Sequence, residues 1–322
     1  MNKILCLGED DILKAVSFSE IMNAVENAML IYEKKQFQMP VRMHADYMGN
    51  TLLLMPCFTP KKFGTKLVSL FPENTRKNLP VLFGTMILND GETGKPLALV
   101  NGSKLTALRT GAVGGVSIRY LTPLNVRTLG IIGAGVQGFH QVLFACTERQ
   151  FSDVFIFDQS ITKIPSFIEK LSRDLRQVKL HQAGSAKELL KESAVIITAT
   201  NSEKPVLPDQ EDLLRGKHFV GIGSYKPNMR EFPDALFKIS DQMFIDTEHA
   251  LDESGDVIDP LKNGWIKNDQ LFTLGKLIQG KIDRKGETTL FKSVGMALFD
   301  VVVSELIYEK AVEKGLGQEV IL

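Results

Sequence analysis

The chain has 322 residues, which is enough for two domains that each bury a core. Its 38 Lys and Arg residues balance its 38 Asp and Glu residues, so it lacks the positive charge expected of a protein that binds nucleic acid or an anionic membrane. No apolar run reaches the roughly 18 residues of a membrane span, and acidic residues at 9–11 follow the start too closely for a signal peptide. We therefore expect a cytoplasmic protein with a small-molecule partner.

The first third of the chain predicts a mixed α+β domain. Apolar positions at helical spacing indicate a helix over about 11–37, and short apolar runs indicate strands at Thr51–Pro56 and Gly64–Leu70. The apolar runs on either side of the turn at 89–94 predict a hairpin. Thr106–Arg119, which is rich in Ala and Gly, predicts a helix that packs closely against another backbone.

From Arg127 onward, strands and helices alternate, which predicts a parallel sheet and an α/β fold of the Rossmann type, doubly wound. The predicted strands are Thr128–Ile132, Val154–Asp158, Ala194–Thr200, His218–Ser224 and Met243–Asp246. The acid-rich segment 246–259 predicts a solvated turn. The tail, Leu290–Lys314, predicts a helix that returns to the first domain.

A glycine motif directly follows the first of these strands and begins a helix. Its residues are Gly133, Ala134, Gly135, Val136, Gln137 and Gly138, in the order GxGxxG. The first glycine permits a tight turn, the second lets the backbone approach a pyrophosphate, and the third lets the helix pack on the sheet. The N-terminus of the helix offers unpaired N–H groups to phosphates. This context predicts a dinucleotide site.

Asp158 ends the next predicted strand, twenty residues beyond Gly138, where a carboxylate accepts hydrogen bonds from ribose hydroxyls. It would repel a 2′-phosphate, and no Arg follows it at 159–161, so NAD(H) is favoured and NADP(H) stays possible. The other interpretation of Asp158 is a surface cap. Thr198, Ala199 and Thr200 end a later strand, where a doubly wound sheet contacts its ligand, although an ordinary loop is equally compatible.

Four further runs resemble the ornithine cyclodeaminase/mu-crystallin family, and with the glycine motif they span most of the chain. They are Pro40–Arg42, Gly64–Asn74, Asn101–Ala112 and Phe291–Asp300. The resemblance implies a dimerisation and substrate-binding domain at 1–122 with 291–322, completed by the C-terminal helix, and a Rossmann dinucleotide-binding domain at 123–290. It also implies a homodimer and a cofactor contact at Thr110.

The same resemblance implies that Arg42, Lys66 and Arg109 line a substrate pocket beside the nicotinamide and hold the carboxylate of an amino or imino acid. A guanidinium can hold a carboxylate with two parallel hydrogen bonds, whereas an ammonium adds a compact charge and a proton. Arg109 lies among small and apolar residues, so it needs an anionic partner. The alternatives are a structural salt bridge for Arg109 and solvated surface charge for the other two.

Position 224 departs from the pattern of true cyclodeaminases, which present an Asp there, because this chain has Gly223-Ser224. A hydroxyl cannot replace a carboxylate as a general base without an activating partner. The sequence around Gly223-Ser224 is more similar to the imine-reducing branch of the family, which includes ketimine reductases and Δ1-pyrroline-2-carboxylate reductases. We expect Arg109 and Arg42 to anchor a cyclic imino acid, Lys66 to orient it and supply a proton, and Ser224 to lie near its ring nitrogen and the cofactor.

Three other functions stay open at this point. One is an ornithine cyclodeaminase, which forms L-proline and ammonia from L-ornithine, and another is an amino-acid dehydrogenase such as one for alanine. The third is a non-enzymatic protein that binds a dinucleotide or small ligand. Cys6, Cys57 and Cys146 have no spacing that suggests a metal site, and we expect none.

Overall fold

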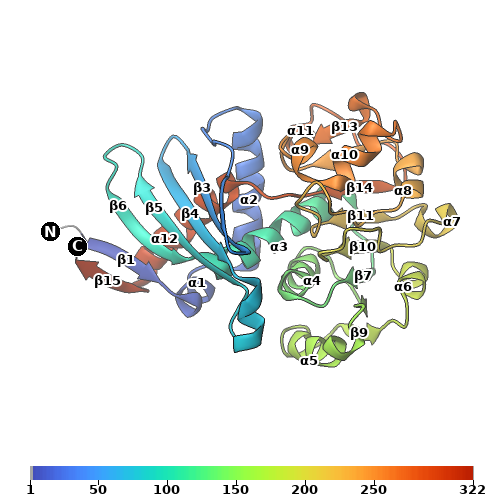
Figure 1. Ribbon diagram of the computed structural model, residues 1–322, viewed down its shortest axis with the longest axis horizontal. Coiled ribbons are helices and arrows are strands. Elements are labelled where there is room, and N and C mark those ends of the chain that lie inside the picture. Colours follow the sequence, from blue (N-terminus) through green and yellow to red (C-terminus); the bar gives the residue numbers. More distant parts are fainter. Residues whose placement is uncertain (1–2, 322) are drawn as a thin grey trace. The chain divides into compact units, whose positions relative to one another are not determined.

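The computed structural model describes residues 3–321, which form two compact units (Figure 1). Unit 1 is the described part of Met1–Arg109 with Met296–Leu322, and unit 2 is Thr110–Gly295. The division falls inside one continuous helix, α3 (Gly102–Leu121). The predicted domain bounds, 122/123 and 290/291, differ from these and stay a prediction.

A seven-stranded sheet forms the centre of unit 1, and its order is β15-β1-β6-β5-β4-β3-β2. Neighbouring strands are antiparallel except for the parallel pair β1 and β6. The hairpin predicted around residues 89–94 is therefore confirmed as β5 and β6. The strands are β1 (Lys3–Leu7), β2 (Met43–Tyr47), β3 (Asn50–Phe58), β4 (Lys62–Leu70), β5 (Leu82–Asp90), β6 (Pro96–Asn101) and β15 (Gln318–Ile321).

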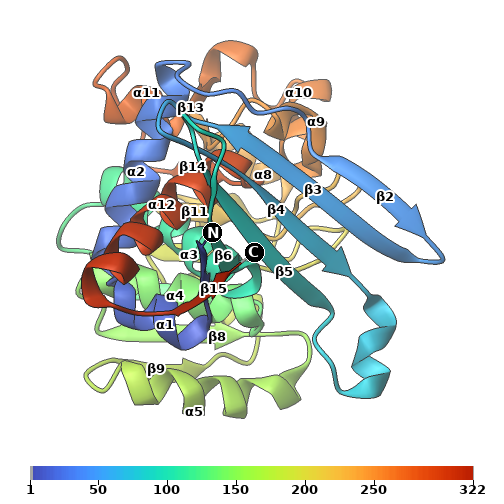
Figure 2. The same cartoon turned by 90° about the vertical axis from the view of Figure 1, so that its left-hand side faces the viewer.

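Three helices belong to unit 1 beside the first turns of α3: α1 (Glu9–Ala15), α2 (Phe18–Glu33) and α12 (Ala297–Lys314). The C-terminal α12 packs against β3, β4 and β5 and against α1 and α2 (Figure 2). The prediction of one helix over 11–37 is wrong, because Ser17 begins a new helix. Its hydroxyl accepts from the backbone N–H of Glu20 while its own N–H donates to the Glu20 carboxylate, a capping box.

Unit 2 contains an eight-stranded sheet in the order β13-β12-β14-β11-β10-β7-β8-β9, and every neighbouring pair is parallel. Six of these strands follow the doubly wound order 3-2-1-4-5-6, which confirms the predicted Rossmann class. The chain reverses direction across the sheet between β7 and β10. The strands are β7 (Thr128–Ile132), β8 (Asp153–Phe157), β9 (Lys179–Gln182), β10 (Val195–Thr198), β11 (His218–Gly221), β12 (Met243–Ile245), β13 (Leu271–Thr273) and β14 (Thr289–Lys292).

Helices accompany the strands of unit 2 in sequence, as a parallel sheet requires. They are α4 (Val136–Glu148), α5 (Ile164–Asp174), α6 (Ala186–Glu192), α7 (Glu211–Leu214), α8 (Asp234–Ile239), α9 (Ala250–Glu253), α10 (Gly255–Lys262) and α11 (Leu274–Ile278). All residues of β10, β11 and β14 are buried, as expected for central strands covered on both faces. Across residues 3–321, no helix has both the length and the apolar character needed to cross a membrane.

Two predictions in this region are wrong. The start of the predicted tail helix is β14, because a short apolar run does not by itself distinguish strand from helix, and Gly295, with φ of 75°, separates it from α12. The acid-rich segment 246–259 is not a solvated turn, since it contains α9 and most of α10 and since Asp246 and Asp256 are buried.

Candidate active site

The glycine motif forms the turn between β7 and α4. Gly133 has φ of 110°, and a Cβ there would lie 2.5 Å from the carbonyl oxygen of Ala199. A Cβ on Gly135 would meet no described atom within 4 Å, so the backbone at this position stays open to a ligand. Because the first N–H groups of a helix have no acceptor within it, the start of α4 can bind an anion there.

Asp158 connects this turn to the loop after β8. Its Oδ2 accepts from the backbone N–H of Ala134 at 2.8 Å, and its Oδ1 accepts from the N–H of Ser160 at 2.8 Å. A carboxylate oxygen has two acceptor positions, so each oxygen keeps one for a ribose hydroxyl. The residue can therefore order the glycine turn and bind a ribose at the same time.

The other predicted cofactor residues lie at the end of β10, in the loop after it, at the start of α4, within α3 and in the loop after β11. Thr198 ends β10, and its buried Oγ1 has no hydrogen-bond partner among residues 3–321; the same holds for Oε1 of Gln137. Thr200 binds Glu231 through its N–H and its hydroxyl, and the carbonyl of Thr110 accepts from Gln141 Nε2 at 2.7 Å. Unpaired buried polar atoms beside the glycine turn fit a dinucleotide that supplies their partners.

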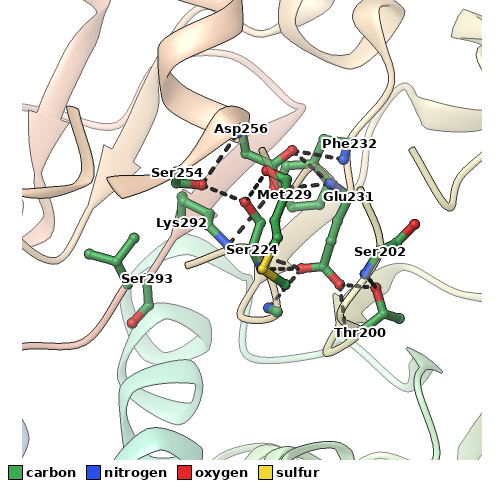
Figure 3. A network of polar contacts seen from close by, with 12 residues as sticks. Thr200, Ser202, Ser224, Met229, Glu231, Phe232, Ser254, Asp256, Lys292 and Ser293 are labelled. Atoms are coloured by element: carbon green, nitrogen blue, oxygen red, sulfur yellow. Dashed lines mark hydrogen bonds and ion pairs between the residues drawn. The ribbon is translucent and has the colours of Figure 1, made fainter. Parts of the chain in front are cut away.

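Ser224, just beyond β11, is fully buried (Figure 3). Its Oγ donates to the carbonyl of Met229 at 2.7 Å and lies 2.7 Å from Oγ of Ser254. The Ser224 hydroxyl uses its one proton on Met229, so in the contact with Ser254 it accepts and the Ser254 hydroxyl donates. Ser224 can therefore only accept a further hydrogen bond. Its roles toward substrate and cofactor stay predictions.

Unit 1 brings the three predicted substrate cations into one electrostatic neighbourhood. Lys66 lies on the inward face of β4 with only 1% of its surface exposed, and its Nζ is 2.9 Å from each carboxylate oxygen of Asp300 in α12. Burial lowers the pKa of Lys66 to about 8; Asp300 raises this pKa, whereas Arg109 and Arg42 lower it further. Lys66 is thus mostly protonated at neutral pH but loses its proton more readily than an ordinary lysine.

The anionic partner that Arg109 was expected to need is also Asp300, whose Oδ1 lies 3.1 Å from Arg109 Nε. The two terminal nitrogens of Arg109 have no hydrogen-bond partner within the described part of the chain. They are therefore available to hold a carboxylate with two parallel bonds. Lys66 and Arg109 carry two positive charges against one on Asp300, and Arg42 adds to the positive potential at Lys66, so the cluster favours an anionic ligand.

The sequence interpretation assigned no role to Asp300, Glu231, Lys292 or Asp256. For two of them, the sequence contains a signal from which a buried charge could have been predicted. Asp300 is the one charged residue in Ala297–Val303, and Lys292 directly follows the apolar residues of β14. A lone charge in an apolar element requires an opposite charge elsewhere, as was argued for Arg109. Over residues 3–321, no three His, Cys, Asp or Glu side chains are placed to hold a metal ion.

Comparison with known proteins gives consistent results. The profile of the ornithine cyclodeaminase/mu-crystallin family matches residues 4–315. A Δ1-pyrroline-2-carboxylate reductase of Bacillus cereus (strain ZK / E33L) is 32% identical over 328 residues, covering 98% of this chain and 99% of the relative.

Among the solved structures that match, two are similar over nearly the whole chain. The Thermococcus litoralis Δ1-pyrroline-2-carboxylate reductase in complex with NADH and L-proline has a TM-score of 0.91 and 34% identity, covering 98% of this chain and 100% of that one. An archaeal alanine dehydrogenase, a dimer with bound NAD, has a TM-score of 0.91 and 30% identity, with 99% of each chain covered.

The position of Asp158 predicts how its replacement changes cofactor selection. In Asp158→Ser we expect the Kd for NADH to rise by roughly 10- to 100-fold, because the ribose and the N–H of Ala134 both lose a charged acceptor worth roughly 1.5–3 kcal/mol. The Kd for NADPH should fall, because a carboxylate no longer repels its 2′-phosphate. Fluorescence titration of both cofactors measures this. Asp174→Ser, at the exposed end of α5, is the control, and an unchanged NADH affinity in Asp158→Ser would contradict the assignment.

Proposed function

Because the chain belongs to the ornithine cyclodeaminase/mu-crystallin family, we propose that it reduces the C=N bond of a cyclic imino acid, with Δ1-pyrroline-2-carboxylate as substrate and L-proline as product. The protein is an NAD(P)H-dependent oxidoreductase, and its cofactor is NAD(H). The observation that carries the proposal is the buried cluster of Lys66, Asp300 and Arg109, which leaves the terminal nitrogens of Arg109 to a carboxylate.

The overall reaction consumes the imino acid, NADH and one proton and yields the cyclic amino acid and NAD⁺. The bound dinucleotide supplies a hydride, which adds to the carbon that bears the carboxylate. Arg109, with Arg42, holds the carboxylate and so fixes the orientation of the adjacent C=N bond. Lys66, with a pKa near 8, carries a proton at neutral pH and can release it toward the ring nitrogen directly or through water.

Ser224 is proposed to lie near the ring nitrogen. Its hydroxyl already donates to Met229, so it would accept a hydrogen bond from a protonated imine and would not act as a base. This distinguishes the chain from a cyclodeaminase, which needs a carboxylate at the substrate's amino group.

Oxidation of an amino acid such as L-alanine is the second candidate, since the archaeal alanine dehydrogenase has the same fold at 30% identity. The same clamp would hold the carboxylate of that substrate. Activity with L-alanine and NAD⁺ therefore has to be measured beside imine reduction, as does release of ammonia from L-ornithine.

The first prediction from this proposal concerns Arg109. The purified protein should oxidise NADH in the presence of Δ1-pyrroline-2-carboxylate and form L-proline, and Arg109→Ala should lower kcat/KM by about 10²-fold, since loss of charge-assisted hydrogen bonds costs roughly 3 kcal/mol. Absorbance of NADH gives the rate. Arg173→Ala, which removes an exposed pair with Glu169 on α5, is the matched control. Equal rates for Arg109→Ala and the unaltered protein would contradict the clamp.

A second prediction concerns the pH profile. Asp300 raises the pKa of Lys66, so Asp300→Asn should lower that pKa below about 8 and move the alkaline limb of kcat/KM to lower pH. At pH 8 we expect a loss of about tenfold, because a larger fraction of Lys66 is deprotonated there. Initial rates from pH 6 to 9 measure this, with Asp90→Asn at the end of β5 as control. An alkaline limb that stays in place would mean that Lys66 does not supply the proton.

The outer face of the sheet in unit 1 supports a homodimer. Leu52, Ser69 and Phe83 are cross-strand neighbours, so they lie on one face, and Lys66 lies on the other. Tyr47 and Leu52 share this outer face because the register of β2 on β3 places them on the same side. Tyr47 is 76% exposed, Phe83 47% and Leu52 42%. A monomer does not normally leave such an apolar face in water.

A cytoplasmic location stays a prediction.

The dimer proposal predicts that Leu52→Asp shifts the protein from dimer to monomer, because a carboxylate at the centre of the outer face cannot be paired there. Light scattering after size exclusion measures the mass. Leu13→Asp, on the exposed side of α1, should leave the mass unchanged. A monomeric unaltered protein would contradict the proposal.

A further inference from the structure

Glu231 joins the ends of two neighbouring parallel strands through one carboxylate. Its Oε1 accepts from the N–H and the hydroxyl of Thr200, at 2.7 and 2.8 Å, in the loop after β10. Its Oε2 accepts from the N–H groups of Gly223 and Ser224, at 2.7 and 3.3 Å, after β11 (Figure 3). Both oxygens are thus fully used within the protein, and Glu231 itself is fully buried.

The charge of Glu231 is balanced from a third strand. Lys292 ends β14, is fully buried, and its Nζ lies 4.0 Å from Glu231 Oε2 and 3.8 Å from Asp256 Oδ2, with no hydrogen-bond partner among residues 3–321. Burial lowers the pKa of Lys292, while the nearby Asp256 and Glu231 raise it. Asp256 in turn accepts the backbone N–H groups of Glu231 and Phe232, at 3.0 and 2.9 Å.

The buried group of Glu231, Lys292 and Asp256 therefore fixes Glu231 at its backbone and at its side chain. Apolar residues of similar volume usually stabilise a protein as well as buried ion pairs do, because charges lose hydration on burial. The charged group instead fixes the geometry between two loops, those after β10 and β11. In a doubly wound sheet, each half binds one nucleotide of a dinucleotide. The second half here consists of β10, β11 and β14, so the loops after β10 and β11 would contact the second nucleotide.

We propose that Glu231 is a positioning residue for the nicotinamide half of the cofactor, and that Lys292 and Asp256 act through it. The inference rests on the proposed use of NADH. By holding the loops after β10 and β11 together, Glu231 fixes the backbone and hydroxyl groups that the nicotinamide nucleotide would contact. The adenosine half would depend instead on Asp158 and the glycine turn, with which Glu231 shares no hydrogen bond among the described residues.

The test compares two ligands that differ in the nicotinamide half. In Glu231→Gln, one oxygen becomes an NH₂ group that faces two donors of one loop, so that loop loses its acceptor. We expect the Kd for NADH to rise at least tenfold and the Kd for ADP, which lacks the nicotinamide nucleotide, to stay within twofold. Calorimetric titration of substrate-free protein measures both. Glu169→Gln, on the exposed face of α5, should change neither value.

A purely structural role would weaken NADH and ADP together, and that result, or an unchanged NADH affinity, would overturn the inference. If Glu231→Gln does not fold, Glu231→Asp decides. It keeps the negative charge beside Lys292 but is one methylene too short to reach both loops, so it should show the same selective loss of NADH. If the unaltered protein binds no NADH, the proposed function fails and the role of Glu231 fails with it; if it binds NADH but reduces no imine, only the proposed function fails.

Discussion

A charge that is removed from water must be paired, and this requirement determines how the chain arranges two buried charged groups. In unit 1, Asp300 pairs with Lys66 and Arg109. In unit 2, Lys292 lies between Glu231 and Asp256. Each group draws its members from elements far apart in the sequence: Asp300 comes 234 residues after Lys66. Neither group can therefore form before the units fold, and each fixes the geometry of a predicted binding surface only in the native state.

The sheet topology of unit 2 explains why Lys292 reaches its partners. After β11 the chain forms β12 and β13 at the outer edge and then returns, placing β14 between β11 and β12. The register pairs Lys292 with Gly221 at the end of β11 and with Ile245 at the end of β12. All three strands are parallel, so their carboxyl ends lie at one edge, where α/β sheets bind ligands. The returning strand β14 thus supplies the cation at this edge.

Local patterns in the sequence predicted the features that depend on neighbouring residues. The glycine turn is six consecutive residues after an apolar strand, and Asp158 follows at a fixed spacing, so both could be located without a structure. The parallel sheet followed from the alternation of elements. Arg42, Lys66 and Arg109 were located only through the resemblance to a family, because an isolated Lys or Arg in a sequence does not distinguish a ligand from a surface charge.

Features that depend on distant residues could not be predicted in this way. The start of β14 was assigned to the tail helix because apolar residues continue into α12. Asp246 and Asp256 were expected in a solvated turn, since acidic side chains are usually exposed. Their burial depends on partners that the sequence does not place: Asp246 accepts from Ser293 Oγ and from the N–H of Gly295.

The cluster in unit 1 also couples the binding of an anion to a proton. Burial brings the pKa of Lys66 to about 8, so near neutral pH this side chain is mostly protonated but not completely. An anionic carboxylate that binds beside it favours the charged form and raises its pKa. By linkage, protonation of Lys66 strengthens binding of the anion by the same factor. Under the proposed function, a substrate that carries a carboxylate would therefore help to keep on Lys66 the proton that its reduction requires, whereas an imine without a carboxylate would leave Lys66 nearer to deprotonation. The buried pair of Lys66 and Asp300 would in this way favour substrates that carry a carboxylate.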